Sequence, residues 1–386
     1  MISTGLDLAI AINMAENRAG NVLSKAAFKL TKNKYLKKQY NGLKANVKYA
    51  SNILARNGDS ITIHLAFSNK NEMNAYVTKL RMYKSRYLIV CYAGLYDYCH
   101  NLFMWLMSSN KFFPIIFANP KVDVTDDIEK LSKYLVINKK IDLSRLSVPY
   151  ILSNSVKDDI FTKGSRNDYA LLLTSIAVEF LFFHEMTHID HGHIDYLKNT
   201  VSGFETLYSL DDTNTASNQL HNDIIGLEQE ADLGAAEFLF DSYWDLQYKG
   251  TLMKLFDTFL TSTDNLIFTI FYSLVWLFHL VQDCREYRGL ASSNCHPSPE
   301  CRILSVFRIF YVLSKNKNGN PDLVQKQFAV AIENYLATCE VSGITPHIKP
   351  NIFSSNSLAS QELIRVEETR LRLLKELKPY QYSRKF

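Results

Sequence analysis

The chain has 386 residues, of which 47% are apolar, 21% charged and 12% aromatic, and its formal net charge is +4. This apolar and aromatic content excludes a disordered protein, and 14 Gly and 9 Pro exclude a collagen-like or Gly/Pro-rich chain. At roughly 150 residues per domain, the length suits two or three structural units or one large elaborated domain. The mild positive charge does not by itself indicate nucleic-acid binding, and we find no specific nucleic-acid motif.

The N-terminal region, residues 1–58, is basic. Residues 17–58 carry ten Lys and Arg and no Asp or Glu, and they contain few Gly and no Pro. We therefore expect a solvated helical hairpin there, with a contact surface for an anionic partner, such as phospholipid or nucleic acid, as the alternative. No basic leader followed by an apolar core opens the chain. We expect a cytoplasmic protein, with peripheral attachment to a membrane as the alternative.

Residues 59–165 are predicted to form an α+β region with a small sheet. Alternating apolar residues from Ile61 to Phe67 are typical of a half-buried strand. The predicted elements, in chain order, are a strand at 60–69, a helix at 70–85, a strand at 86–95 that runs into a helix ending at 107, and a strand at 112–118. Turn signals then accumulate between 120 and 165, which predicts a boundary.

Residues 166–315 are predicted to form a helical core, and residues 316–386 a C-terminal helical region. The predicted helices lie at 168–191, 219–247, 264–287, 300–314 and 357–378, and a polar, irregular segment lies at 199–218. The fold class is therefore predicted to be α+β and predominantly helical, with a small N-terminal sheet.

The longest apolar run covers residues 266–281 and contains His279. As a helix these 16 residues would span about 24 Å, which is less than the roughly 30 Å hydrocarbon core of a bilayer. Charged residues, Asp264 and Asp283, flank the run. We expect a buried core helix packed near the long helix at 168–191, with a membrane span as the alternative.

A His-Glu-x-x-His motif, formed by His184, Glu185 and His188, lies within the long apolar helix. Residues four apart share one face of a helix, so both imidazoles can reach the same metal ion. Glu185 is then placed to take a proton from water that the metal activates. The alternative is a chance match, a risk that every short motif carries.

A catalytic zinc site needs a third protein ligand and one open position. His191 lies one turn beyond His188, but it is close to the predicted helix end. The metzincin pattern would need a His at position 194, where this chain has Ile194. The remaining candidates are Glu228 and Asp232, which share a face of the next helix, so that one can bind the metal while the other braces a ligand imidazole.

These two motifs, HEMTH at 184–188 and EQEAD at 228–232, resemble those of the zinc metallopeptidases grouped around the CAAX prenyl proteases and the heat-shock protease HtpX. Two smaller features agree with this resemblance. His193 follows the second His of the motif, and His296-Pro297 precedes a helix start with Arg302. A looser likeness, in overall organisation, is to the phage-exclusion peptidase Lit and its relatives. The first resemblance implies a gluzincin-type peptidase with a zincin-like core over residues 166–315.

The motifs and the resemblance together predict one zinc ion per chain, bound by His184, His188 and Glu228, with Glu185 as the general base. Four further roles follow around this centre. Asp232 accepts a hydrogen bond from a ligand His, His193 lies beside the ligands, His296 donates to the oxyanion or is a simple turn residue, and Arg302 pairs with an active-site carboxylate or caps a helix.

The predicted function is a zinc-dependent metalloendopeptidase that cleaves a protein or peptide substrate. A Lit-like phage-defence protease that cleaves a host cytoplasmic protein is one alternative. Others are a non-catalytic binding or regulatory protein on a metallopeptidase scaffold, and a zinc hydrolase that acts on another bond. Because Glu185 is present, the substitution that usually marks an inactive member of such a group is absent.

Overall fold

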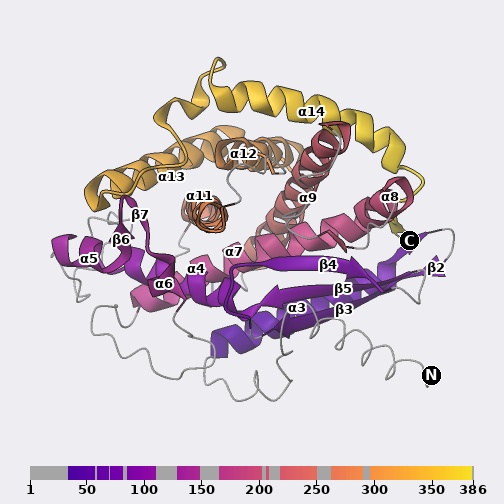
Figure 1. Ribbon diagram of the computed structural model, residues 1–386, viewed down its shortest axis with the longest axis horizontal. Coiled ribbons are helices and arrows are strands. Elements are labelled where there is room, and N and C mark those ends of the chain that lie inside the picture. The colour runs from indigo at the N-terminus through magenta and orange to yellow at the C-terminus, as the bar shows by residue number, and fades with distance from the viewer. Residues whose placement is uncertain are drawn as a thin grey trace.

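A computed structural model of the chain describes residues 34–56, 59–68, 70–80, 85–109, 128–147, 165–201, 206–207, 218–249, 262–289 and 296–384. Over these residues the protein is predominantly helical with a small mixed sheet, which confirms the predicted fold class. Helix α3 (Lys34–Ile53) contacts both the small sheet and the long helix α7 (Ser165–Asp190), and its buried residues belong to the same apolar core as the long helices (Figure 1).

The main sheet has four strands in the order β3-β5-β4-β8. Their bounds are β3 (Thr62–Ser68), β4 (Ala75–Lys79), β5 (Arg86–Tyr92) and β8 (Thr206–Leu207). Strand β3 is parallel to β5, whereas β4 is antiparallel to both β5 and β8. The strands predicted at 60–69 and 86–95 are confirmed, and the strand predicted at 112–118 lies outside the described residues.

The helix predicted at 70–85 is wrong, because strand β4 occupies the middle of this segment. Tyr76 and Val77 are fully buried, and Val77 lies opposite Ile89 of β5 in the antiparallel ladder. The aromatic and β-branched residues of Ala-Tyr-Val-Thr suit a pleated, buried surface. Pairing with a neighbouring strand therefore outweighs the apparent helical pattern of a short segment.

Helix α3 (Lys34–Ile53) contains much of the basic N-terminal stretch and packs against β3. It buries Leu43 and Val47, while Lys44 and Lys48 on its other side are exposed. The described part of the stretch is thus a helix docked on the sheet and differs from the solvated hairpin that we expected; residues 17–33 lie outside the described part.

The described residues also form two further small antiparallel sheets. Strands β1 (Leu54–Arg56), β2 (Asp59–Ser60) and β9 (Ser383–Arg384) form a three-stranded sheet, and β6 (Val136–Ile137) pairs with β7 (Lys140–Ile141). Because β9 pairs with β1, the C-terminal end of the chain returns to its N-terminal region.

The remaining elements are helices. They are α4 (Ala93–Leu106), α5 (Ile128–Leu135), α6 (Leu143–Leu146), α7 (Ser165–Asp190), α8 (His193–Thr200), α9 (Asn218–Lys249), α11 (Thr263–Tyr287), α12 (Pro299–Asn316), α13 (Pro321–Ser342), the 3-10 helix η1 (Pro350–Phe353) and α14 (Leu358–Leu377). The five helices predicted from 168 onward are confirmed, whereas α13 has no counterpart among the predicted elements. Helix α7 lies at the centre, against α4, α9, α11 and β4.

Among the described residues, two helical segments, Arg166–Asp190 and Thr263–Tyr287, are long and apolar enough to cross a membrane by length and composition alone. The second spans about 37 Å at 1.5 Å per residue, so the length argument made from residues 266–281 does not hold. In each segment 83% of the apolar window is buried inside the protein. Helix α11 packs directly against α7, as expected for a core helix.

Candidate metal centre

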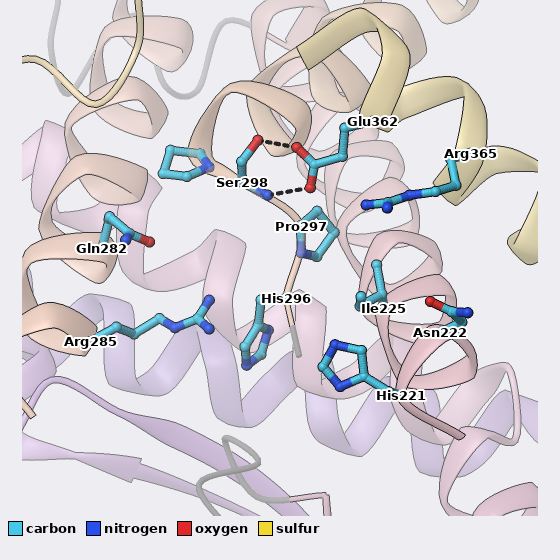
Figure 2. A pocket seen from close by; sticks show the side chains of 11 residues that line it. His221, Asn222, Ile225, Gln282, Arg285, His296, Pro297, Ser298, Glu362 and Arg365 are labelled. Atoms are coloured by element: carbon cyan, nitrogen blue, oxygen red, sulfur yellow. Dashed lines mark hydrogen bonds between the residues drawn. The ribbon is translucent and has the colours of Figure 1, made fainter. Parts of the chain in front are cut away.

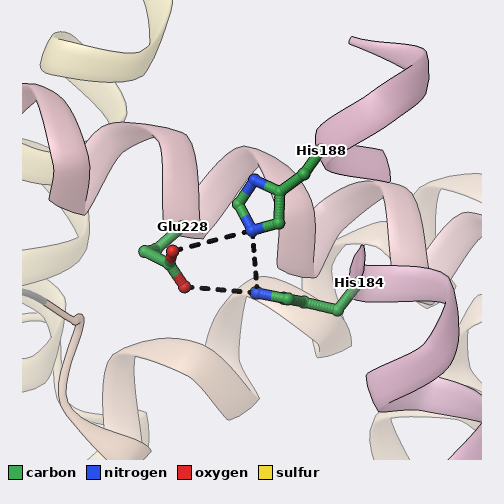
Figure 3. Close-up of side chains that lie close together, drawn as sticks. All are labelled: His184, His188 and Glu228. Atoms are coloured by element: carbon green, nitrogen blue, oxygen red, sulfur yellow. Dashed lines mark hydrogen bonds and ion pairs between the residues drawn. The ribbon is translucent and has the colours of Figure 1, made fainter. Parts of the chain in front are cut away.

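The imidazoles of His184 and His188 and the carboxylate of Glu228 converge at one buried point between α7 and α9 (Figure 3). The two Nε2 atoms are 3.1 Å apart. Glu228 Oε2 lies 3.2 Å from the Nε2 of His184, and Oε1 lies 3.6 Å from the Nε2 of His188. One potential ligand atom from each residue lies within 4.8 Å of the others.

Close packing of two helices brings these side chains together. His184 and His188 are one turn apart on α7, and Glu228 faces them from α9, which packs extensively on α7. Gly234 permits this approach, because a Cβ atom at this position would lie 2.5 Å from Cγ2 of Thr187. The small residue on α9 thus sets the distance at which its carboxylates meet the α7 imidazoles.

Asp232 orients the first imidazole. Its Oδ1 lies 2.9 Å from Nδ1 of His184, so that the Nδ1–H donates to the carboxylate and Nε2 keeps a lone pair. Arg302 of α12 donates to the same carboxylate through Nε and Nη2, both at 2.7 Å. The guanidinium also lies over the ring of Phe278, 4.6 Å from its centroid. Arg302 therefore pairs with a carboxylate of the site.

His193 contacts the second imidazole. Its Nδ1 lies 2.8 Å from Nδ1 of His188, so one of the two nitrogens carries a proton and donates it to the other. The turn that places His193 depends on Gly192, whose φ of 75° is in the left-handed region that favours glycine. A Cβ at Gly192 would also lie 2.2 Å from the backbone oxygen of Tyr380.

The donor atoms fit a zinc ion. Zinc–ligand distances near 2.1 Å put the ligands of a tetrahedral site roughly 3.4 Å apart, close to the separations between His184, His188 and Glu228. Oε2 of Glu228 is buried and has no hydrogen-bond partner in suitable geometry among the described residues. Two imidazoles and a carboxylate are a donor set that zinc accepts, and their converging lone pairs favour a cation between them.

The pKa values of these side chains also favour a positive charge at the centre. Burial lowers the pKa of His184, but its hydrogen bond to Asp232 and the nearby carboxylate of Glu228 outweigh burial and raise that pKa to about 10. Burial lowers the pKa of His188 to about 3, so this imidazole is neutral at physiological pH, which is the form that binds metals. The pKa of Glu228 is held well below its usual value, because the neighbouring His296 and His184 outweigh its burial.

Glu185 is buried beside the three converging side chains, with 8% of its surface exposed. Burial raises its pKa to about 8, the adjacent Glu228 adds to this effect, and His184 and a backbone hydrogen bond from Val77 of β4 oppose it. A carboxyl group with a pKa near neutrality is suited to general acid–base chemistry.

His296 connects this centre to a pocket of about 360 Å³ between α9, α11, α14 and the start of α12 (Figure 2). Its Nδ1 lies 2.9 Å from Oε2 of Glu228, and its ring lines the pocket. Arg285 and Arg365 also line this space. Glu362 of α14 accepts hydrogen bonds from the backbone N–H and the hydroxyl of Ser298, which anchors the segment that carries His296.

The other candidates lie away from the converging ligands. His191 Nδ1 is 2.9 Å from Oε1 of Glu230, and Glu230 also accepts a hydrogen bond from Arg370 of α14. Neither His191 nor Glu230 belongs to the metal-ligating group. Sequence reasoning did not find the pocket residues Arg285, Glu362 and Arg365, because nothing in the local pattern of α11 or α14 indicates a site.

A family model described as Peptidase U49 matches residues 89–319, which is more than half of the chain. The chain belongs to the peptidase U49 family. Members of a peptidase family act on a protein or peptide substrate, and the matched region contains the three converging side chains, Asp232, His296 and Arg302. No curated protein and no solved structure matches the chain.

Membership of the U49 family bears on both resemblances. The phage-exclusion peptidase Lit is itself a U49 peptidase, so the looser likeness leads to the family that matches. The match does not confirm the resemblance to the CAAX prenyl protease and HtpX group. The pairing of HEMTH with EQEAD thus indicates a peptidase without identifying its family.

Proposed function

We propose that this U49 peptidase is a zinc-dependent metalloendopeptidase, with one zinc ion held by His184, His188 and Glu228. The observation that carries the proposal is the buried convergence of two imidazoles and a carboxylate on a His-Glu-x-x-His helix, within a chain of a peptidase family. Zinc in such a site supplies a Lewis acid for a peptide carbonyl and activates water at neutral pH.

Residues of the chain itself have the other roles in the proposed mechanism. Glu185 takes the proton of the attacking water and passes it to the leaving amine, a role that its raised pKa supports. Asp232 holds His184 in the tautomer that leaves Nε2 free for the metal, and Arg302 keeps Asp232 ionised. His193 does the same for His188 through their shared proton.

The substrate enters through the pocket that His296 shares with the metal centre. Because His296 lies at the boundary between the pocket and Glu228, a peptide in the pocket would bring its carbonyl close to the His296 ring. We assign His296 the role of hydrogen-bond donor to the oxyanion. Arg285, Arg365 and the carboxylate of Glu362 line the same walls.

Chelation and metal restoration test the proposal. The purified chain is incubated with a denatured protein substrate, then stripped with a chelator, and finally supplied with one equivalent of Zn²⁺, and the products are mapped by mass spectrometry. Cleavage should disappear on stripping and return with zinc. Cleavage that persists in the stripped protein, with no metal detected, would refute a zinc-dependent mechanism.

Membership of the U49 family also favours a more specific function. Because Lit belongs to this family, we propose as a second candidate a phage-defence protease that cleaves a host cytoplasmic protein. Expression in a bacterial host, with the proteome compared before and after phage infection, tests this function. A new cleaved host protein that appears only on infection and only with intact Glu185 supports it, and an unchanged proteome refutes it.

A further inference from the structure

A second group of side chains that could hold a metal ion lies at α11, outside the first centre. His279 and Asp283 are one turn apart on this helix, and His347 reaches them from the segment between α13 and η1. His279 Nε2 lies 3.3 Å from Oδ2 of Asp283, and His347 Nε2 lies 2.8 Å from Oδ1. One potential ligand atom from each residue lies within 4.8 Å of the others.

One ring nitrogen in this group makes no hydrogen bond of suitable geometry to the described residues. His279 is fully buried, and its Nε2 makes no hydrogen bond of suitable geometry to any described residue. The nitrogen points toward the Asp283 carboxylate, whose side chain is 2% exposed. A buried, unsatisfied nitrogen facing a buried carboxylate costs free energy unless a proton or a metal ion lies between them.

The other ring nitrogen of His279 is braced as in metal sites. His279 Nδ1 lies 2.7 Å from the hydroxyl of Tyr335, which also accepts the backbone N–H of His347 at 2.9 Å. His347 Nδ1 faces Oε1 of Glu286 at 3.9 Å. A metal-binding imidazole typically donates its second N–H to an oxygen of this kind, which leaves the Nε2 lone pair for the metal.

We propose that His279, Asp283 and His347 bind a second divalent cation of the zinc type. Two imidazoles and one carboxylate are the same donor set as in the first centre, and the 3.3 Å separation of His279 Nε2 and Asp283 Oδ2 suits two ligands of one ion. The 2.8 Å contact between His347 Nε2 and Asp283 Oδ1 is a hydrogen-bond distance, which an ion between these atoms would lengthen. The site is structural, because no glutamate of a His-Glu-x-x-His motif accompanies it and His279 is fully buried.

This cation would join three parts of the chain. Helix α11 supplies two ligands, the segment after α13 supplies the third, and the backbone N–H of Ile141 in β7 donates to Asp283 at 3.3 Å. Glu286 of the same helix pairs with Lys140 of β7. Because α11 also packs against α7, the second ion would stabilise the helix layer that supports the first centre.

Metal counting on matched variants tests the proposal. The wild-type chain, stripped by a chelator, reloaded with Zn²⁺ and freed of excess metal, should hold two zinc ions per chain. His347→Ala and Glu228→Ala should each hold one, and the double variant none. His347 is the better position for substitution because its side chain is partly exposed, whereas His279 is fully buried. His64→Ala, which removes a half-buried histidine outside both groups, should retain two.

Thermal unfolding gives a second readout that does not depend on activity. Added Zn²⁺ should raise the unfolding midpoint of Glu228→Ala and leave that of Glu228→Ala/His347→Ala unchanged. Asp283→Asn, which preserves the side-chain shape, should lose the same single zinc ion as His347→Ala.

Two results would overturn the proposal. One is a wild-type chain that holds a single zinc ion, which only Glu228→Ala removes; the other is two zinc ions in His347→Ala. The first result would leave a metal-free, hydrogen-bonded His–Asp–His network. If the chain shows no proteolysis but His347→Ala still loses one zinc ion, only the proposal for the first centre is affected.

Discussion

Glu228 and Asp232, four residues apart on α9, face the two ring nitrogens of the same imidazole. Glu228 Oε2 lies 3.2 Å from Nε2 of His184, and Asp232 Oδ1 lies 2.9 Å from Nδ1. One turn of α9 therefore presents a candidate metal ligand and the group that orients another candidate ligand. The α7–α9 packing distance then affects both contacts at once.

Substitution Glu185→Gln should leave the metal content intact and abolish proteolysis. The change removes a proton acceptor while preserving the size of the side chain, and loss of a general base typically costs 10²- to 10⁴-fold in rate. Metal analysis and a cleavage assay on the same preparation measure the two effects. Cleavage by Glu185→Gln at the wild-type rate would show that another group accepts the proton.

Substitution Glu228→Ala should remove the metal of the first centre, and His191→Ala should retain it. The carboxylate of Glu228 lies beside both Nε2 atoms, whereas His191 pairs with Glu230 away from them. Zinc counts against the wild type measure the difference. The reverse pattern would make His191, just after α7, the third ligand and refute the proposed site.

Substitution Arg302→Ala should destabilise the protein strongly. Arg302 and Asp232 are both buried, and removing one partner of a buried pair typically costs about 3–5 kcal/mol because the other charge stays buried without compensation. Urea unfolding of the metal-free protein measures the loss. Arg372→Ala provides the control, since Arg372 is 40% exposed and exposed pairs contribute roughly 0–1 kcal/mol. Equal losses at the two positions would contradict the importance of the Asp232 contact.

Substitution Gly234→Ala should weaken both stability and metal binding. The added methyl would meet Thr187 at 2.5 Å, and overpacking of this kind costs about 1–3 kcal/mol. The double variant Gly234→Ala/Thr187→Ala, which removes the clashing atoms, should recover most of the loss. Gly42→Ala on α3 is the control, because nothing lies within 4 Å of its Cβ position. If the double variant is no more stable than Gly234→Ala, the added methyl group clashes with a residue other than Thr187.

Fractionation of cells should recover the protein without detergent. Helix α11 is long enough to span a bilayer, but most of its apolar window is buried against other helices. A basic surface on α3 would hold the protein at an anionic membrane only electrostatically, so high salt should release it. Release by detergent alone would identify α11 or α7 as a membrane span.

The helical core and the paired histidines of the site follow from sequence alone. The four-residue spacing of His184 and His188 determines that they share a face of α7, because that relation is local to one helix. The long apolar periodicity likewise predicts α7, α9 and α11. Strand β4 was mispredicted, because its pairing with β5 is a contact that no local pattern encodes.

Only the tertiary structure selects among the carboxylates of α9. Glu228 and Glu230 are two residues apart, and the rotation of α9 against α7 directs the first toward His184 and the second toward His191 and Arg370. The second cluster depends even more on the fold. His279 and Asp283 are neighbours on one helix, but His347 joins them from 64 residues away through the path of the chain after α13. The spacing of residues within one helix follows from the sequence, whereas contacts between elements depend on how all the helices pack together.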